Sequence, residues 1–201
     1  MKNRKFVMGA AAILLPLSLI SMIGVTAASA KAGAINQPGT LTCAKVTGTI
    51  SFSPPLITGG TAKTDNISVS ASLKKCSVGG GGTVKAAKGT ATASYSSSGN
   101  NCTSLAAPST TPITFNVTWA PASKIKPTSI TFPGSTPTTG TNPGFKLGPA
   151  TSGAGSYPGS DNFKSSTSSS TLKQTTAQIT AMCSGAGVST LNIKSGTSTS
   201  S

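Results

Sequence analysis

The sequence has no histidine and no glutamate, and its only acidic residues are Asp65 and Asp161. Without histidine, no Ser-His or Cys-His nucleophile pair can form. A glycosidase needs two carboxylates beside the bond it cleaves, and nothing in the sequence brings Asp65 and Asp161 together. The histidine, thiolate and carboxylate ligands that metals require are equally scarce. We therefore expect a protein that is not an enzyme and holds no metal or cofactor.

Positive charge in this chain has almost nothing to balance it. Arg4 is the only arginine, and beyond residue 30 thirteen lysines accompany the two aspartates. Such an excess attracts anionic polymers. Nucleic acid is disfavoured, because bidentate contacts to phosphates and base edges call for arginine. The predicted partners are anionic polymers of the cell envelope or acidic glycans, and no nucleic acid.

The first thirty residues predict a secretory signal peptide. Three positive charges within residues 2–5 precede an uncharged apolar run over 6–25, and Ala28-Ser29-Ala30 supplies the small-x-small cleavage pattern. An uncleaved membrane anchor is the alternative, since the run is nearly long enough to span a bilayer. We favour cleavage, which predicts a secreted protein, released or loosely held at the envelope, with residues 31–201 as one domain.

Two runs of strict alternation predict a β-hairpin stapled by a disulfide. Small or apolar residues occupy every second position in 46–52 and 67–73, with Ser, Thr or Lys between them. Pro54-Pro55 and Gly59-Gly60 predict that the chain turns between the runs. An antiparallel register that sets Cys43 opposite Cys76 also sets Phe52 opposite Ile67, so one register aligns the cysteines and both apolar faces.

The rest of the chain predicts an all-β domain of about eight strands. Alternation marks strands near 87–95, 113–119, 130–132, 172–183 and 188–195, and no helical period appears. The 87–95 strand has a small-residue face that another group can approach closely. The expected architecture is a single antiparallel β-sandwich or an up-and-down β-barrel. Residues 31–39 and the tail 196–201 are expected to be loose.

Residues 133–170 are almost entirely Gly, Ser, Thr and Pro and predict a long surface loop. The alternative is a binding loop that presents Phe145, Tyr157 and Phe163. Trp119 lies on an apolar strand face, so we expect it to pack in the core and not to serve as a sugar platform.

Four cysteines in a secreted chain predict two disulfides, for which three pairings are possible. If the strands run up and down in order, Cys43 and Cys76 meet at one end of the sheet and Cys102 and Cys183 at the other. We favour this pairing, and a Cys76–Cys102 bridge is its main rival.

Several stretches resemble uncharacterised secreted β-rich proteins of actinobacteria. The matching stretches cover most of the chain after the signal peptide, and they are Cys-x-x-x-x-Gly-x-Ile-x-Phe-x-Pro-Pro-Leu from Cys43 to Leu56, Lys75-Cys76, Cys102-x-x-Leu105, Phe115 to Trp119, Cys183-Ser-Gly-Ala-Gly-Val and Ile193-Lys-Ser-Gly. The resemblance implies secretion, β-structure and paired cysteines, and it carries no function.

Three hypotheses for function follow from the sequence. The first is a non-enzymatic interaction or structural protein at or near the cell envelope. The second is a carbohydrate-binding module whose ligand contacts are Tyr95, Phe145 and Tyr157. The third, which we rank last, is a membrane-active toxin or a hydrolase.

Overall fold

A computed structural model describes residues 33–61, 63–81, 85–86, 88–158 and 162–201. The chain from Ala32 onward forms one compact unit. The predicted signal peptide and Asp161 lie outside the described residues. Within those residues, no helix combines the length and the apolar character needed to cross a membrane.

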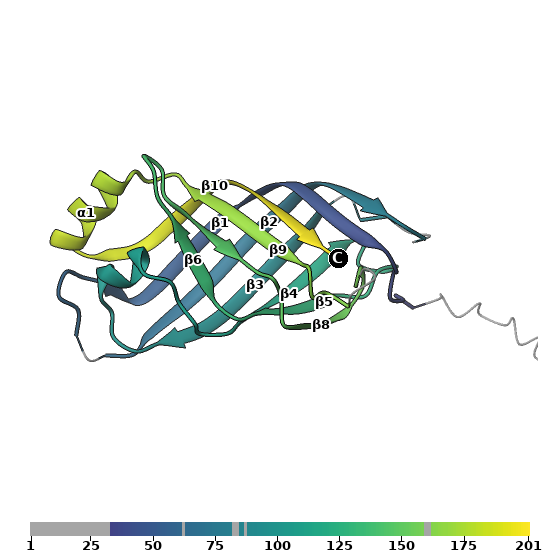
Figure 1. Cartoon of the computed structure of the whole chain (residues 1–201), viewed down its shortest axis with the longest axis horizontal. Coiled ribbons are helices and arrows are strands. Elements are labelled where there is room, and N and C mark those ends of the chain that lie inside the picture. The colour runs from purple at the N-terminus through teal and green to yellow at the C-terminus, as the bar shows by residue number, and fades with distance from the viewer. Residues whose placement is uncertain (1–32, 62, 82–84, 87, 159–161) are drawn as a thin grey trace, which may run out of the picture. The chain divides into compact units, whose positions relative to one another are not determined.

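The domain is all-β, with ten antiparallel strands in one sheet (Figure 1). The strands follow the order β6-β7-β9-β10-β1-β2-β3-β4-β5-β8. Their bounds are β1 (Thr40–Leu56), β2 (Asp65–Gly79), β3 (Lys88–Ser97), β4 (Ile113–Ala120), β5 (Thr128–Phe132), β6 (Ser135–Thr138), β7 (Gly144–Leu147), β8 (Ser152–Gly155), β9 (Thr167–Leu172) and β10 (Val188–Ser200). A short 3-10 helix, η1 (Cys102–Ala106), and one α-helix, α1 (Thr176–Ser184), complete the fold.

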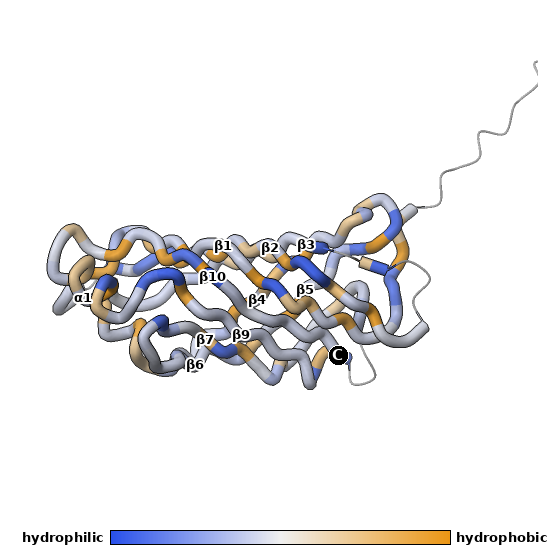
Figure 2. The backbone as a smooth tube through the Cα atoms, turned by 90° about the horizontal axis from the view of Figure 1, so that it is seen from above, coloured by the Kyte–Doolittle hydropathy of each residue, from blue (hydrophilic) through white to orange (hydrophobic). Residues whose placement is uncertain are grey.

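The sheet curls into a half-barrel. Only Pro133 and Gly134 separate β5 from β6, although these strands lie near opposite edges of the sheet. A flat ten-stranded sheet cannot bring its edges that close, because neighbouring strands are about 4.8 Å apart. Figure 2 shows hydrophobic positions interspersed with neutral ones along the strands. Buried residues among them, such as Ile50, Ile67 and Val117, line the inside of the curl.

The β1–β2 register is the one that the sequence predicts. Cys43 pairs with Cys76, and Phe52 with Ile67. The predicted turn lies at Gly59-Gly60, but Pro54-Pro55, which we expected outside any regular element, belong to β1, which continues to Leu56. Pairing with β2 stops at Ser53, and pairing with β10 shifts between Ser51 and Leu56. The prolines, which lack an N–H, therefore occupy positions where no ladder bond is required.

The inward alternation changes phase near the cysteines. Lys74 and Lys75 are consecutive exposed residues in β2, and Lys75 has a φ of 52°. At the matching level of β1, Ala44 and Lys45 are both exposed. This shift buries Cys43 in the same core as the strand centre, although strict alternation would turn its side chain outward.

Two disulfides join distant parts of the chain, Cys43–Cys76 and Cys102–Cys183. This is the pairing that the sequence analysis favours, and its rival Cys76–Cys102 does not occur. The second bridge ties η1 to α1 across 81 residues. Two disulfides are compatible with an extracellular protein.

The long loop predicted for residues 133–170 is wrong in large part. This segment forms β6, β7, β8 and the start of β9, and Phe145 lies within β7. These strands are short and poor in apolar residues, so their backbone pairs without leaving an alternation in the sequence. Phe163 is 1% exposed and packs with Ile130 and Phe132, so it is not presented to solvent.

The strand predicted for residues 172–183 is also wrong. It divides into the end of β9 and helix α1. A capping box begins the helix: Thr175 Oγ1 accepts from the Gln178 amide at 3.2 Å, and Gln178 Oε1 accepts from the Thr175 amide at 2.9 Å. The tail predicted to fray belongs to β10, where the Ser200 hydroxyl donates to the Tyr157 carbonyl at 2.9 Å.

Trp119 packs in the core, as the sequence predicts. Its side chain is 3% exposed, and its indole Nε1 donates to Thr128 Oγ1 at 2.7 Å. Its ring meets Tyr157 edge-on with centroids 5.6 Å apart. Gly89 pairs with Trp119, and a Cβ there would lie 2.6 Å from the indole ring. The small-residue face of β3 therefore lets the bulky Trp119 side chain approach closely, as the sequence predicts.

Candidate functional site

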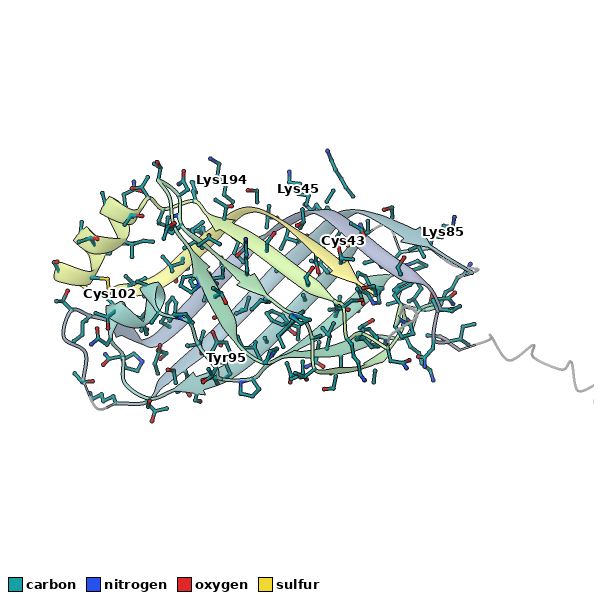
Figure 3. The ribbon with its side chains drawn as sticks, in the orientation of Figure 1. Cys43, Lys45, Lys85, Tyr95, Cys102 and Lys194 are labelled. Carbon is teal, nitrogen blue, oxygen red and sulfur yellow. A yellow bond between two sulfur atoms is a disulfide. The ribbon has the colours of Figure 1, made fainter. Side chains whose placement is uncertain are left out.

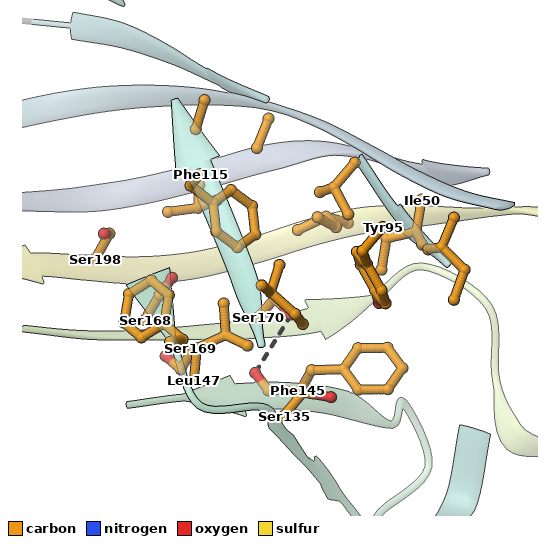
Figure 4. Close-up of a pocket in the computed structure, with 18 of the residues that line it drawn as sticks. Ile50, Tyr95, Phe115, Ser135, Phe145, Leu147, Ser168, Ser169, Ser170 and Ser198 are labelled. Carbon is orange, nitrogen blue, oxygen red and sulfur yellow. Dashed lines mark hydrogen bonds between the residues drawn. The ribbon is translucent and has the colours of Figure 1, made fainter. Parts of the chain in front are cut away.

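A cavity of about 170 Å³ lies inside the curl of the sheet (Figure 4). Residues of nine strands line it, and β8 contributes none. A concave space of this volume with a largely apolar wall is the first candidate for a binding site.

The cavity exists because one cross-strand row is made of small residues. Gly48 of β1 pairs with Ala71 of β2, which pairs with Ala91 of β3, and Ala91 pairs with Val117 of β4. Opposite residues in adjacent strands lie side by side on one face. Two alanines in the middle of the concave face therefore leave room that larger side chains would fill.

Most of the cavity wall is apolar. Side chains of β1–β5 supply aliphatic and aromatic surface, chiefly Ile50, Phe52, Ile67, Val69, Leu73, Ile113, Phe115 and Phe132. Hydroxyl groups from β9 and β10 face this surface, chiefly Ser168, Ser170 and Ser198. No lining residue is charged, although the chain carries a net charge of +14.

The serine hydroxyls on β9 already donate their protons within the protein. Ser168 Oγ donates to the Thr197 carbonyl at 3.2 Å, and Ser170 Oγ donates to the Phe145 carbonyl at 3.4 Å (Figure 4). A hydroxyl has one donor and two acceptor positions. These oxygens can therefore accept a hydrogen bond from a ligand more readily than they can donate one.

Tyr95 adds a donor to the cavity. It is half-buried on β3, and its hydroxyl makes no hydrogen bond with the residues that the structure describes. Burial raises the pKa of this hydroxyl above its ordinary value, and the nearby negative charge of Asp65 raises the pKa further. Tyr95 therefore stays a neutral phenol at neutral pH and keeps its proton available for a ligand.

The structure separates the three aromatic residues that the sequence proposes as ligand contacts. Tyr95 and Phe145 both line the cavity, from β3 and β7, and both are half-buried (Figure 4). Tyr157 does not line it. Its side chain is fully buried, and its hydroxyl accepts from the Ala86 amide at 3.0 Å. The three rings therefore do not form the exposed platform that stacking on a sugar requires.

Sequence reasoning missed most of the cavity. The alternation of small residues in β3 predicted that another group could approach this strand closely. Ala91, which lines the cavity, is one of those small residues. The β9 serines lie in a stretch made of Ser and Thr, so nothing in the sequence distinguishes the residues that reach the cavity from those that do not. Only the pairing of β9 with β7 and β10 brings them to the cavity.

The lining of the cavity offers apolar surface and hydroxyl groups to a ligand. It contains no carboxylate, imidazole, amine or thiol. No group of three or more His, Cys, Asp or Glu gathers within the part of the chain that the structure describes. No protein-family model, curated protein or solved structure matches this chain significantly. Any assignment of function therefore depends on the geometry above.

Proposed function

We propose that the protein is a secreted, non-enzymatic binding protein whose cavity holds a small, uncharged and largely apolar molecule. The observation that carries this proposal is the cavity itself, with an apolar wall, a hydroxyl wall and no charge. Burial of apolar surface drives such binding, at about 25 cal/mol per Å² removed from water. The disulfides and the predicted signal peptide support action outside the cell.

The cavity volume limits the size of the ligand. An apolar cavity of about 150 Å³ in another protein holds one benzene molecule, whereas pockets for drug-sized ligands span about 300–1,000 Å³. At about 170 Å³, this cavity fits a single ring or a short branched chain. A larger molecule would place only one such group inside.

The polar groups define the other end of the ligand. A hydroxyl on the ligand can donate to the β9 serine oxygens and accept from Tyr95. A carboxylate or ammonium would lose its hydration with no opposite charge to compensate, which costs several kcal/mol. We therefore favour an alcohol with an apolar body as the ligand class.

Calorimetric titration of residues 31–201 with benzyl alcohol, cyclohexanol and benzoate tests this proposal. We expect the two alcohols to bind and benzoate to fail. Ala91→Leu should weaken binding of the alcohols about tenfold or more, because it places an isobutyl group in the space that they need. Thr92→Leu adds the same group to the next residue of β3, which is exposed, and should leave binding unchanged.

Two results would contradict the proposal. The first is that Ala91→Leu binds the alcohols as tightly as the unmodified protein does, with thermal unfolding showing that the variant is folded. The other is binding of neutral oligosaccharides in preference to the alcohols, which would favour a carbohydrate-binding module instead.

A further inference from the structure

Three lysines lie directly opposite one another on the outer face of the sheet. Lys45 of β1 pairs with Lys74 of β2, and Lys74 pairs with Lys88 of β3. All three side chains are exposed. Figure 3 shows Lys45 projecting away from the ribbon. We call these residues the lysine row; they lie on the face opposite to the cavity.

No exposed acidic side chain in the described part of the chain balances the lysine row. Asp65 is the only acidic residue there, and it is 1% exposed. Like charges that face each other across neighbouring strands destabilise a sheet. The stability of the fold therefore does not explain the lysine row, whereas a bound anion would relieve the repulsion.

Rows of hydroxyl groups continue the same outer face. Thr47 of β1, Ser72 of β2, Thr90 of β3 and Thr118 of β4 are paired in succession, two positions along each strand from the lysine row. The next row holds Thr49, Ser70, Thr92 and Asn116. The outer face thus carries a regular array of neutral hydrogen-bonding groups beside a line of positive charge.

A surface groove joins the two kinds of row. Lys74 and Lys88 line it together with Ser72, Thr90 and Thr118. The groove crosses β2, β3 and β4, at right angles to the direction of the strands. An extended polymer that follows the groove would meet ammonium groups on one side and hydroxyl groups on the other.

We infer that the outer face of β1–β4 binds an acidic polysaccharide. Lysine supplies a point charge for carboxylate groups, and Ser and Thr hydroxyls can exchange hydrogen bonds with sugar hydroxyls. Adjacent strands are about 4.8 Å apart, so two neighbouring lysines can contact one acidic sugar. Double-stranded DNA fits less well, because this face offers no arginine for bidentate contacts to base edges. This inference is independent of the cavity ligand.

Binding of polygalacturonate by residues 31–201 tests the inference, with neutral dextran and double-stranded DNA as comparison polymers. We expect polygalacturonate to bind at low salt, dextran to fail and DNA to bind more weakly. Lys74→Ser with Lys88→Thr should reduce affinity for polygalacturonate about five- to tenfold, as expected for two exposed charge contacts. Lys146→Thr with Lys173→Thr removes the same charge from β7 and the residue after β9, and should change affinity less than twofold.

The possible outcomes separate site binding from general charge attraction. An equal loss in both double variants would show that only net charge matters and would overturn the inference. No binding of polygalacturonate, or tighter binding of DNA, would also overturn it. Benzyl alcohol titration provides a folding control for those variants if the cavity binds it, and thermal unfolding provides one in either case.

Discussion

Asp65 is a buried carboxyl group whose two oxygens have different surroundings. Oδ1 accepts a hydrogen bond from the Ser53 amide at 3.0 Å, whereas Oδ2 has no hydrogen-bond partner in the described residues. Burial raises the pKa of Asp65, and the hydrogen bond from Ser53 partly opposes that shift. A raised folded-state pKa means that folding favours the protonated form. The contribution of Asp65 to stability is therefore most favourable below about pH 4 and declines as the pH rises through the folded pKa.

Replacement of Asp65 by Asn should remove this pH dependence. The amide oxygen can still accept from Ser53, and no buried charge remains, so we expect stability at pH 7 to rise by about 1 kcal/mol. Urea unfolding between pH 4 and pH 8 measures the change. Asp161→Asn removes the only other side-chain carboxylate and serves as the control. An unchanged pH slope in Asp65→Asn would show that Asp65 does not cause it.

Single residues explain which parts of the site the sequence could reveal. Tyr95 and Phe145 stood out because aromatics are scarce, and both line the cavity, half-buried and not exposed. Tyr157 stood out for the same reason but is fully buried. Because the chain has few aromatic residues, each of them is expected to have a structural or binding role. Scarcity does not tell whether the ring faces the core, the cavity or solvent, because that depends on partners distant in sequence.

Helix α1 is held to the domain by one disulfide, by polar links and by the partly buried Ile179 and Met182, which pack against the core. Cys183 is its only buried residue, and it forms the bridge to Cys102. The Cys183 carbonyl also accepts from the Thr58 amide at 3.1 Å. A nine-residue helix is marginal without such support.

Removal of the Cys102–Cys183 bridge should therefore loosen α1 before the sheet. We expect Cys102→Ala with Cys183→Ala to lower stability by about 2–4 kcal/mol and to raise amide hydrogen exchange throughout residues 176–184. Exchange in β1 and β2 should rise far less. Cys43→Ala with Cys76→Ala is the comparison variant, because it removes a bridge within paired strands. Equal protection of α1 in both variants would contradict this picture.

The elements show where pattern reasoning succeeds and where it fails. The β1–β2 register was predictable because Phe52, Ile67 and the two cysteines constrain it together. Helix α1 was not, because Ala177, Ile179 and Ala181 alternate as they would in a strand. The stronger signal was the Thr175–Gln178 capping box. Strands β6–β8 hold few apolar residues, so only their pairing with β5, β7 and β9 defines them.

The whole molecule depends on pairing between the two ends of the described domain. Strand β10 pairs with β1, and Ser198 lies opposite Cys43. The final residues of the chain also pair with β9. The Ser201 amide donates a hydrogen bond to Oγ of Ser166, the residue before β9, at 2.9 Å. The last strand thus completes the middle of the sheet and not its edge.

Deletion of residues 196–201 should consequently destabilise the whole domain. At about 1 kcal/mol for each lost hydrogen bond, we expect a loss of about 3 kcal/mol or more and a lower thermal midpoint. A variant that lacks residues 31–34 instead should keep its midpoint, since β1 begins at Thr40. Unchanged thermal unfolding after deletion of 196–201 would contradict the role assigned to β10.

The shortness of the outermost strands has a consequence for behaviour at high concentration. Both β6 and β8 are four residues long, and they contain Pro137 and Gly153 respectively. Such strands offer little backbone for another copy of the chain to extend. The long pairing surfaces of β1, β2 and β10 lie in the interior of the sheet, already occupied on both sides. Self-association into fibrils is thereby discouraged, and the protein should elute from a sizing column as a monomer even in concentrated solution.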